Sequence, residues 1–340
     1  MIEPPVAIDL RARPSWRHVK SNIFTGLMLA ALLLVAIPLV FVLASVIDKG
    51  AGSAFKDAPL TPIPLVIGLG ILLFRGIKSR VGLVVTGIGL VIVIVCVATD
   101  STVLPAFFTA AIPKVSFRPG PGMGPAIVGT LLVTGGATLI AVPLGILGAV
   151  YLHEYGGRSV FARLVRFMAV VMTGVPSVVM GLFVYITWTL NFGYSAFGGA
   201  LALACLMLPV VIGTTEQMLK LVPNHLREAS YALGASKART ILTVVLPAGL
   251  PGIVSGCLLA VARAAGETAP LLFTVGASTA YNLHFFDGAN NALPPQIFEN
   301  AKAAAVAQND RAWGAALTLI LLTFLITLIA RIVTARFAKR

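Results

Sequence analysis

The chain has 340 residues, of which 58% are hydrophobic and only 11% are charged, and its formal net charge is +13 at pH 7. About 25% of the residues of an ordinary soluble domain are charged, and disordered chains combine low hydrophobicity with high charge, so the composition excludes both classes. It predicts a multi-span membrane protein whose Lys and Arg gather in cytoplasmic loops, rather than a protein with a basic nucleic-acid-binding face.

Long apolar runs predict the membrane-spanning helices, because a helix needs about 20 apolar residues to cross the bilayer. The runs are continuous rather than alternating, which argues against a β-barrel and favours an all-α helical bundle. A basic segment, 1–22, precedes the first run, and an outer loop, 99–124, precedes the fourth. The predicted spans are 23–47, 60–74, 81–98, 125–152, 167–190, 198–219, 250–278 and 313–335.

The distribution of basic residues predicts the orientation of these eight spans. With a cytoplasmic N-terminus, 18 of the 25 Lys and Arg residues fall in the cytoplasmic segments and six in the outer segments. This bias follows the positive-inside rule and predicts that both termini are cytoplasmic. The short, proline-rich run at 60–74 is the weakest span. Without the helical pair at 60–98, six core spans remain and the downstream orientation is unchanged.

The cysteines and histidines indicate no metal or redox site. Cys96, Cys205 and Cys257 each lie in an apolar run, where cysteine behaves as a small hydrophobic residue. His153-Glu154 lacks the second histidine of a zinc-binding H-E-x-x-H helix, because position 157 is Gly. We therefore expect no cofactor in this chain.

The segment 220–247, on the predicted cytoplasmic side, has the pattern of two short amphipathic helices. Apolar residues recur at helical spacing in its first half, Gly234 ends this helix, and Ser236 can cap a second helix that runs to Leu246. Helices this short are marginal alone, so we expect them to lie in a groove of a partner protein. The alternative is an amphipathic segment at the membrane interface.

This segment also resembles a known family. Glu228-Ala229-Ser230, followed by Gly234 and by Leu246-Pro247, is similar to the EAA loop of ABC-importer permeases, with Ser230 where alanine is more common. In that family the loop docks on the ATPase subunit. The resemblance implies an ABC-importer permease fold and a role in ATPase coupling for Arg227, Glu228, Ala229, Gly234, Leu246 and Pro247.

Further stretches resemble the permease subunits of phosphate importers within that family. The resemblance covers the first span and a permease core at 125–340, and it leaves out 60–98. It implies one of two different permease subunits in a bacterial plasma membrane, assembled with an ATPase dimer and a phosphate-binding protein. The sequence contains no GxxxxGK[ST] motif, so ATP and Mg²⁺ would be bound by the ATPase. The stretches are 154–156, 173–185, 214–223, 262–274 and 313–318.

Arg263 and Glu267 are the ionisable residues that the predicted spans place well inside the membrane. An arginine at the centre of a membrane helix costs about 2.5–3.5 kcal/mol on insertion scales and commonly marks a substrate path. The two residues share a helix face, and arginine supplies the forked donors that phosphate needs. We expect Arg263 to exchange Glu267 for phosphate; the alternative is an ion pair that only fixes helix packing.

Four hydroxyl side chains near prolines in the spans are further candidates for the substrate path. A proline frees a backbone carbonyl of its helix and is tolerated where the helix lines a cavity, so a nearby hydroxyl can donate to a passing oxyanion. For each hydroxyl alone, a bond to its own helix is the favoured alternative. The candidates are Ser177, Thr214, Thr215 and Thr268.

Together these features predict the permease subunit of an ATP-driven importer of inorganic phosphate, which forms half of the translocation pathway and performs no covalent chemistry. One alternative is a permease for another oxyanion, such as sulfate or molybdate. A second is a secondary anion transporter, which has no use for an ATPase-docking loop and would usually carry more intramembrane acids. Two details stay open: whether 293–298 is a re-entrant helix or a docking segment, and whether Glu216 is solvated or faces the ATPase.

Overall fold

The computed structural model describes residues 16–55, 106–113, 122–157 and 159–337. All regular structure in these ranges is helical, as predicted. Five of the described helices are long and apolar enough to cross a membrane, or six if one bent pair counts as a span. The predicted helical pair at 60–98, and most of the predicted outer loop at 99–124, lie outside the described residues.

The first of two compact units, Met1–Asp48, contains most of helix α1. This helix runs without interruption over Trp16–Ala54 and confirms the predicted first span at 23–47. Its large apolar side chains, from Ile23 to Leu43, are exposed in this unit. A helix that is hydrophobic on all sides is typical of a membrane span.

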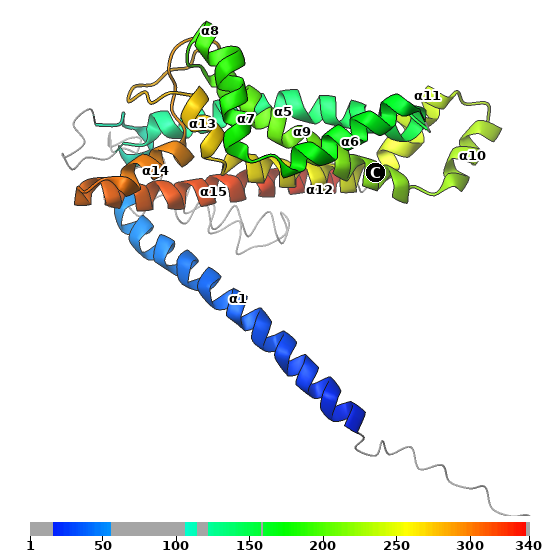
Figure 1. Cartoon of the computed structure of the whole chain (residues 1–340), viewed down its shortest axis with the longest axis horizontal. Coiled ribbons are helices and arrows are strands. Elements are labelled where there is room, and N and C mark those ends of the chain that lie inside the picture. The colour runs from blue at the N-terminus through cyan, green and yellow to red at the C-terminus, as the bar shows by residue number, and fades with distance from the viewer. Residues whose placement is uncertain (1–15, 56–105, 114–121, 158, 338–340) are drawn as a thin grey trace, which may run out of the picture. The chain divides into compact units, whose positions relative to one another are not determined.

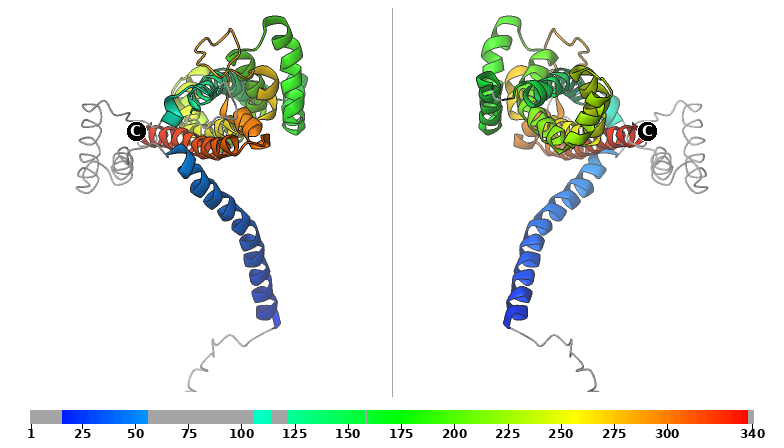
Figure 2. Two further views of the ribbon diagram at one scale, coloured as in Figure 1. Left: turned by 90° about the vertical axis from the view of Figure 1, so that its left-hand side faces the viewer. Right: turned by 90° about the vertical axis from the view of Figure 1, so that its right-hand side faces the viewer.

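The second unit, Lys49–Arg340, is built on four helices that run along one another, as Figure 1 shows from the side and Figure 2 from the two ends. Helices α5 and α9 make the most extensive contact, and α12 packs on α9 and α15. Three of these helices confirm the spans predicted at 125–152, 198–219 and 313–335. The four are α5 (Gly124–Val150), α9 (Ala196–Leu221), α12 (Leu246–Ala265) and α15 (Val306–Phe337).

Small residues allow α5 and α9 to approach closely. A Cβ atom at Gly145 would lie 2.6 Å from Cγ1 of Val211, so only glycine fits at this crossing. Ala137 and Ala141 on α5 are fully buried in the same core as Leu203 on α9. Helices in a membrane associate through such close packing, because lipid provides no hydrophobic drive between them.

The span predicted at 167–190 is not one continuous helix. The chain forms α6 (Val160–Gly174) and α7 (Ser177–Val184), which is extended by a π-helical turn, η2 (Tyr185–Thr189), and by α8 (Leu190–Phe192). The two halves are bent by 108°. The break has a physical cause: Pro176 has no N–H to donate, and it disfavours helical geometry at the preceding Val175, which is extended.

The helix predicted as a continuous span at 250–278 has different bounds at both ends in the structure. It begins earlier, because α11 (Lys237–Thr240) continues through a π-helical turn, η3 (Ile241–Val245), into α12. It ends earlier, because α12 stops at Ala265 and the chain resumes helical geometry only in α13 (Ala269–Thr274). Gly266 follows the last turn of α12 and Pro270 opens α13, as is usual at helix ends and starts.

The two ends of the bundle carry different segments. Helices α10 (Asn224–Ala232) and α11 lie at one end, and α13 and α14 (Leu293–Lys302) lie toward the other (Figure 1). The segment at 293–298 is the first part of α14; the N–H of Leu293 donates to Oγ1 of Thr130 at 2.8 Å. Its first three residues are buried, so they are held in the bundle rather than presented to a partner.

Candidate functional site

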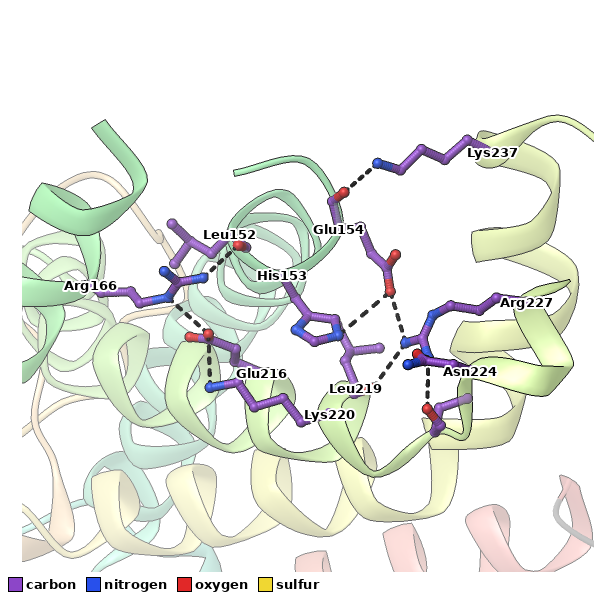
Figure 3. A network of polar contacts seen from close by, with 11 residues as sticks. Leu152, His153, Glu154, Arg166, Glu216, Leu219, Lys220, Asn224, Arg227 and Lys237 are labelled. Carbon is purple, nitrogen blue, oxygen red and sulfur yellow. Dashed lines mark hydrogen bonds and ion pairs between the residues drawn. The ribbon is translucent and has the colours of Figure 1, made fainter. Parts of the chain in front are cut away.

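A cluster of charged side chains lies where α5, α9 and α10 meet (Figure 3). Helix α5 ends in a π-helical turn, η1 (Tyr151–Tyr155), which carries Glu154. Oε1 of Glu154 accepts a hydrogen bond from Nη2 of Arg227 at 3.0 Å, and only 8% and 12% of the two side chains are exposed. Nζ of Lys237 donates to the backbone carbonyl of Glu154. One residue of η1 therefore contacts both helices of the 220–247 segment.

Arg227 also closes the C-terminal end of α9. Its guanidinium donates to the backbone oxygens of Val222 at 2.7 Å and Leu219 at 3.1 Å, and to Oδ1 of Asn224 at 3.2 Å. The last carbonyls of a helix have no partner within that helix, and a basic side chain commonly binds them. Arg227, predicted as an ATPase-coupling residue, thus faces its own chain.

A second ion pair joins α6 to α9 beside the first. Oε1 of Glu216 lies 2.9 Å from Nε of Arg166 and 3.1 Å from Nζ of Lys220. Nη2 of Arg166 also donates to the backbone oxygen of Leu152 at 2.7 Å. The carboxylate of Glu216 is buried, so it is neither solvated nor presented to a partner by this chain.

The 220–247 segment has the predicted helix–glycine–helix form at its start. Helix α10 ends before Gly234, and the hydroxyl of Ser236 accepts a hydrogen bond from the N–H of Arg239 at 3.4 Å. The hydroxyls of Ser230 and Thr240 lie 2.8 Å apart in a buried contact that ties α10 to α11. Ser230 therefore has a role that the more common alanine could not fill.

One face of this segment is exposed. Glu228 and Ala229 are exposed, Tyr231 is 42% exposed, and Leu233 is 89% exposed. Pro247 is exposed in the first turn of α12, and Leu246 is half-buried beside it. These side chains are the part of the segment that is accessible from outside this chain.

Gly234 is required by the backbone at the turn between α10 and α11. Its φ angle is +80°, in the left-handed region where a side chain is strained. We expect Gly234→Val to destabilise this turn by about 1–2 kcal/mol. Limited proteolysis after the neighbouring Tyr231 should accelerate by roughly tenfold, while Gly213→Ala, in open space on α9, should leave the rate unchanged. Equal cleavage rates would contradict the requirement for glycine.

Arg263 and Glu267 lie at a helix break rather than in mid-helix. Arg263 is in the last turn of α12, and Glu267 is in the turn before α13. Nε of Arg263 and Oε1 of Glu267 are 3.7 Å apart, and 71% of the arginine side chain is exposed. The pair is therefore loose, and the donors of the guanidinium remain accessible on the surface of this chain.

The four predicted hydroxyls do not form one group. Thr214 donates to the backbone oxygen of Val210 in its own helix at 2.9 Å. Thr215 is fully buried, with no hydrogen-bond partner for its hydroxyl among the described residues, so it does not line an open path in this structure. Ser177 opens α7 and Thr268 precedes α13, and these two helices pack together.

Comparison with known proteins identifies the family. Residues 141–340 match the family described as "Binding-protein-dependent transport system inner membrane component". The chain belongs to this family. Together with its apolar helices, this membership makes it a multi-pass permease of the bacterial plasma membrane.

Curated relatives of the permease include two phosphate transport proteins. The chain is 50% identical over 215 residues to "Phosphate transport system permease protein PstA 1" of Mycobacterium tuberculosis, covering 62% of this chain and 70% of the relative. It is 42% identical over 232 residues to "Phosphate transport system permease protein PstA" of Yersinia pestis, covering 68% and 78%.

Solved structures support the fold of the permease. One is an inward-facing MetNI methionine ABC transporter, with a TM-score of 0.51 and 18% identity over 63% of this chain and 93% of that chain. Another is a bacterial ABC transporter that imports the acidic polysaccharide alginate, with a TM-score of 0.54 and 15% identity over 94% and 99%. At these identities the likeness concerns the fold alone.

Sequence reasoning missed the charged cluster of the permease. It placed Glu154 in a rejected zinc motif and in the stretch 154–156 that resembles phosphate-importer permeases, without a role for its side chain, and it left Glu216 open. One signal was present: these two are the only acidic residues between Asp100 and Glu228, and each sits at the end of an apolar helix. An isolated acid in such a place needs a cationic partner.

Proposed function

We propose that this permease is the membrane subunit of an ATP-driven importer of inorganic phosphate and forms half of its translocation pathway. The observation that carries the proposal is the 50% identity to a phosphate transport permease over 215 residues. The matched family region, 141–340, contains both the exposed face of the 220–247 segment and the break between α12 and α13. The permease is a transport subunit, and the partner ATPase hydrolyses ATP.

The proposed topology has eight spans with both termini in the cytoplasm. Basic residues support it, because they concentrate in the segments assigned to the cytoplasm. In this arrangement the end of the bundle with α10 and α11 faces the ATPase dimer. The opposite end, with α14, faces a phosphate-binding protein, and a second, different permease subunit completes the pathway.

Arg263 is the proposed phosphate contact. Its guanidinium is exposed on this chain, as a group must be if the pathway lies between two permease subunits. A forked guanidinium binds phosphate through paired, charge-assisted hydrogen bonds. The loose contact with Glu267 lets the carboxylate compensate the arginine when phosphate is absent, which supports the predicted exchange. Ser177 and Thr268 are candidates to donate to the same anion.

The test is the dependence of ATP hydrolysis on the anion in the reconstituted complex. The permease would be combined with its second permease, ATPase dimer and binding protein in proteoliposomes. Phosphate-loaded binding protein should stimulate hydrolysis several-fold, and protein incubated with sulfate or molybdate should not. Stimulation by sulfate alone would retain the importer and contradict the substrate.

A further inference from the structure

Apolar residues at both ends of the 220–247 segment pack in the buried core, and polar side chains connect α10 and α11 to the end of α5. Helix α10 packs mainly on η3 and α11, its own neighbours in the chain. Its direct connection to the end of α5 is the ion pair between Arg227 and Glu154, with 3.0 Å between Nη2 and Oε1. Figure 3 shows the carboxylate of Glu154 pointing at Arg227, with Lys237 reaching the backbone of the same residue.

The pair is placed to move three elements together. Arg227 binds the last carbonyls of α9 through Leu219 and Val222 while it binds Glu154 at the end of α5. The ends of α5 and α9 and the start of α10 therefore meet at one guanidinium. Both side chains of the pair are nearly buried, and removal of one partner of a buried pair leaves an uncompensated charge, which is strongly unfavourable.

We propose that Glu154 is a positioning residue that fixes the 220–247 segment to α5, so that movement of the segment by the ATPase is passed to the transmembrane helices. This inference rests on the proposed function, because it assumes an ATPase docked on α10. Glu154 touches neither phosphate nor ATP. Its contribution is to the ratio between ATP hydrolysed and phosphate imported.

Two measurements test the proposal in the full complex. Glu154→Gln keeps the size of the side chain and removes its charge, and it should raise the number of ATP molecules hydrolysed per phosphate imported by about tenfold. A purely structural defect would lower both rates together and leave the ratio unchanged. Arg227→Gln should give a similar ratio, and the double variant should match the worse single variant rather than multiply the two effects.

Proteolysis tests the hold on the segment without any transport. In the full-length chain without ATPase, chymotrypsin cleavage after Tyr231 or Leu233 should be about tenfold faster in Glu154→Gln. The matched control is Glu299→Gln, which breaks an exposed pair with Lys302 on α14 and should leave the cleavage rate unchanged. An unchanged ATP-to-phosphate ratio in Glu154→Gln would overturn the proposal, whatever the cleavage rate.

The experiments distinguish failure of the proposed phosphate import from failure of the positioning role of Glu154. If the wild-type complex showed no ATP-driven phosphate uptake, the proposed function would be contradicted. Faster cleavage in Glu154→Gln would then still support the hold of Glu154 on the segment, and equal cleavage would overturn that hold as well.

Discussion

Arg263→Gln is expected to lower ATP-driven phosphate uptake by about 100-fold while leaving the yield of assembled complex unchanged. The glutamine keeps one amide donor group but lacks the positive charge and the paired N–H donors of the guanidinium. Loss of charge-assisted hydrogen bonds to an anion costs about 1.5–3 kcal/mol each, and two such bonds account for the expected effect. Because the guanidinium is 71% exposed and only loosely paired, its removal disturbs little of the packing of this chain.

A matched variant separates charge from geometry. Arg263→Lys keeps the charge but not the fork, so its uptake should lie between those of wild type and Arg263→Gln. If the pair with Glu267 served packing alone, Arg263→Gln and Glu267→Gln would lower complex yield together and leave uptake per complex the same. Uptake by Arg263→Gln within twofold of wild type would contradict the anion contact.

Leu233→Glu is expected to abolish uptake by releasing the ATPase. Leu233 is 89% exposed at the turn between α10 and α11, and burial of a leucine contributes about 1.5–3 kcal/mol. A charge forced into that contact adds a desolvation cost, so we expect ATPase affinity to fall by about 30-fold or more. The measurement is the amount of ATPase that copurifies with the permease.

The control for this variant lies at the other end of the bundle. Leu283 is 70% exposed in the segment between α13 and α14, so Leu283→Glu adds the same charge to a comparably exposed site. It should retain the ATPase fully. Equal retention by both variants would exclude Leu233 from the ATPase contact.

The main helices of the bundle could be predicted because the membrane restricts which backbone conformations an apolar segment can adopt. In lipid every backbone group must be bonded within the segment, so a long apolar run such as 125–152 has one outcome, and α5 confirms it. The turn after α10 was equally predictable, since Gly234 and Ser236 are local signals that act through their own backbone.

The breaks could not be predicted from hydropathy. The sequence is apolar on both sides of Val175 and Pro176, and a proline is compatible with either a kinked helix or a sharp turn. The structure has a bend of 108° there. The same ambiguity placed Arg263 in the middle of a helix, whereas it lies in the last turn of α12.

The charged cluster depends on tertiary structure. Glu154 and Arg227 are 73 residues apart in the chain, so no local pattern joins them. The resemblance assigned Arg227 to ATPase coupling, but its side chain turns inward to α9. The exposed residues of that segment, including Leu233, follow from the helix phase that this inward contact sets.

The most direct test of ATP-driven phosphate import is the uptake of labelled phosphate into proteoliposomes that contain the permease with its second permease, ATPase and binding protein. Uptake should require both ATP and the ATPase, and unlabelled phosphate should compete while sulfate and molybdate should not. Uptake that persists without the ATPase, or that only another oxyanion suppresses, would contradict this account.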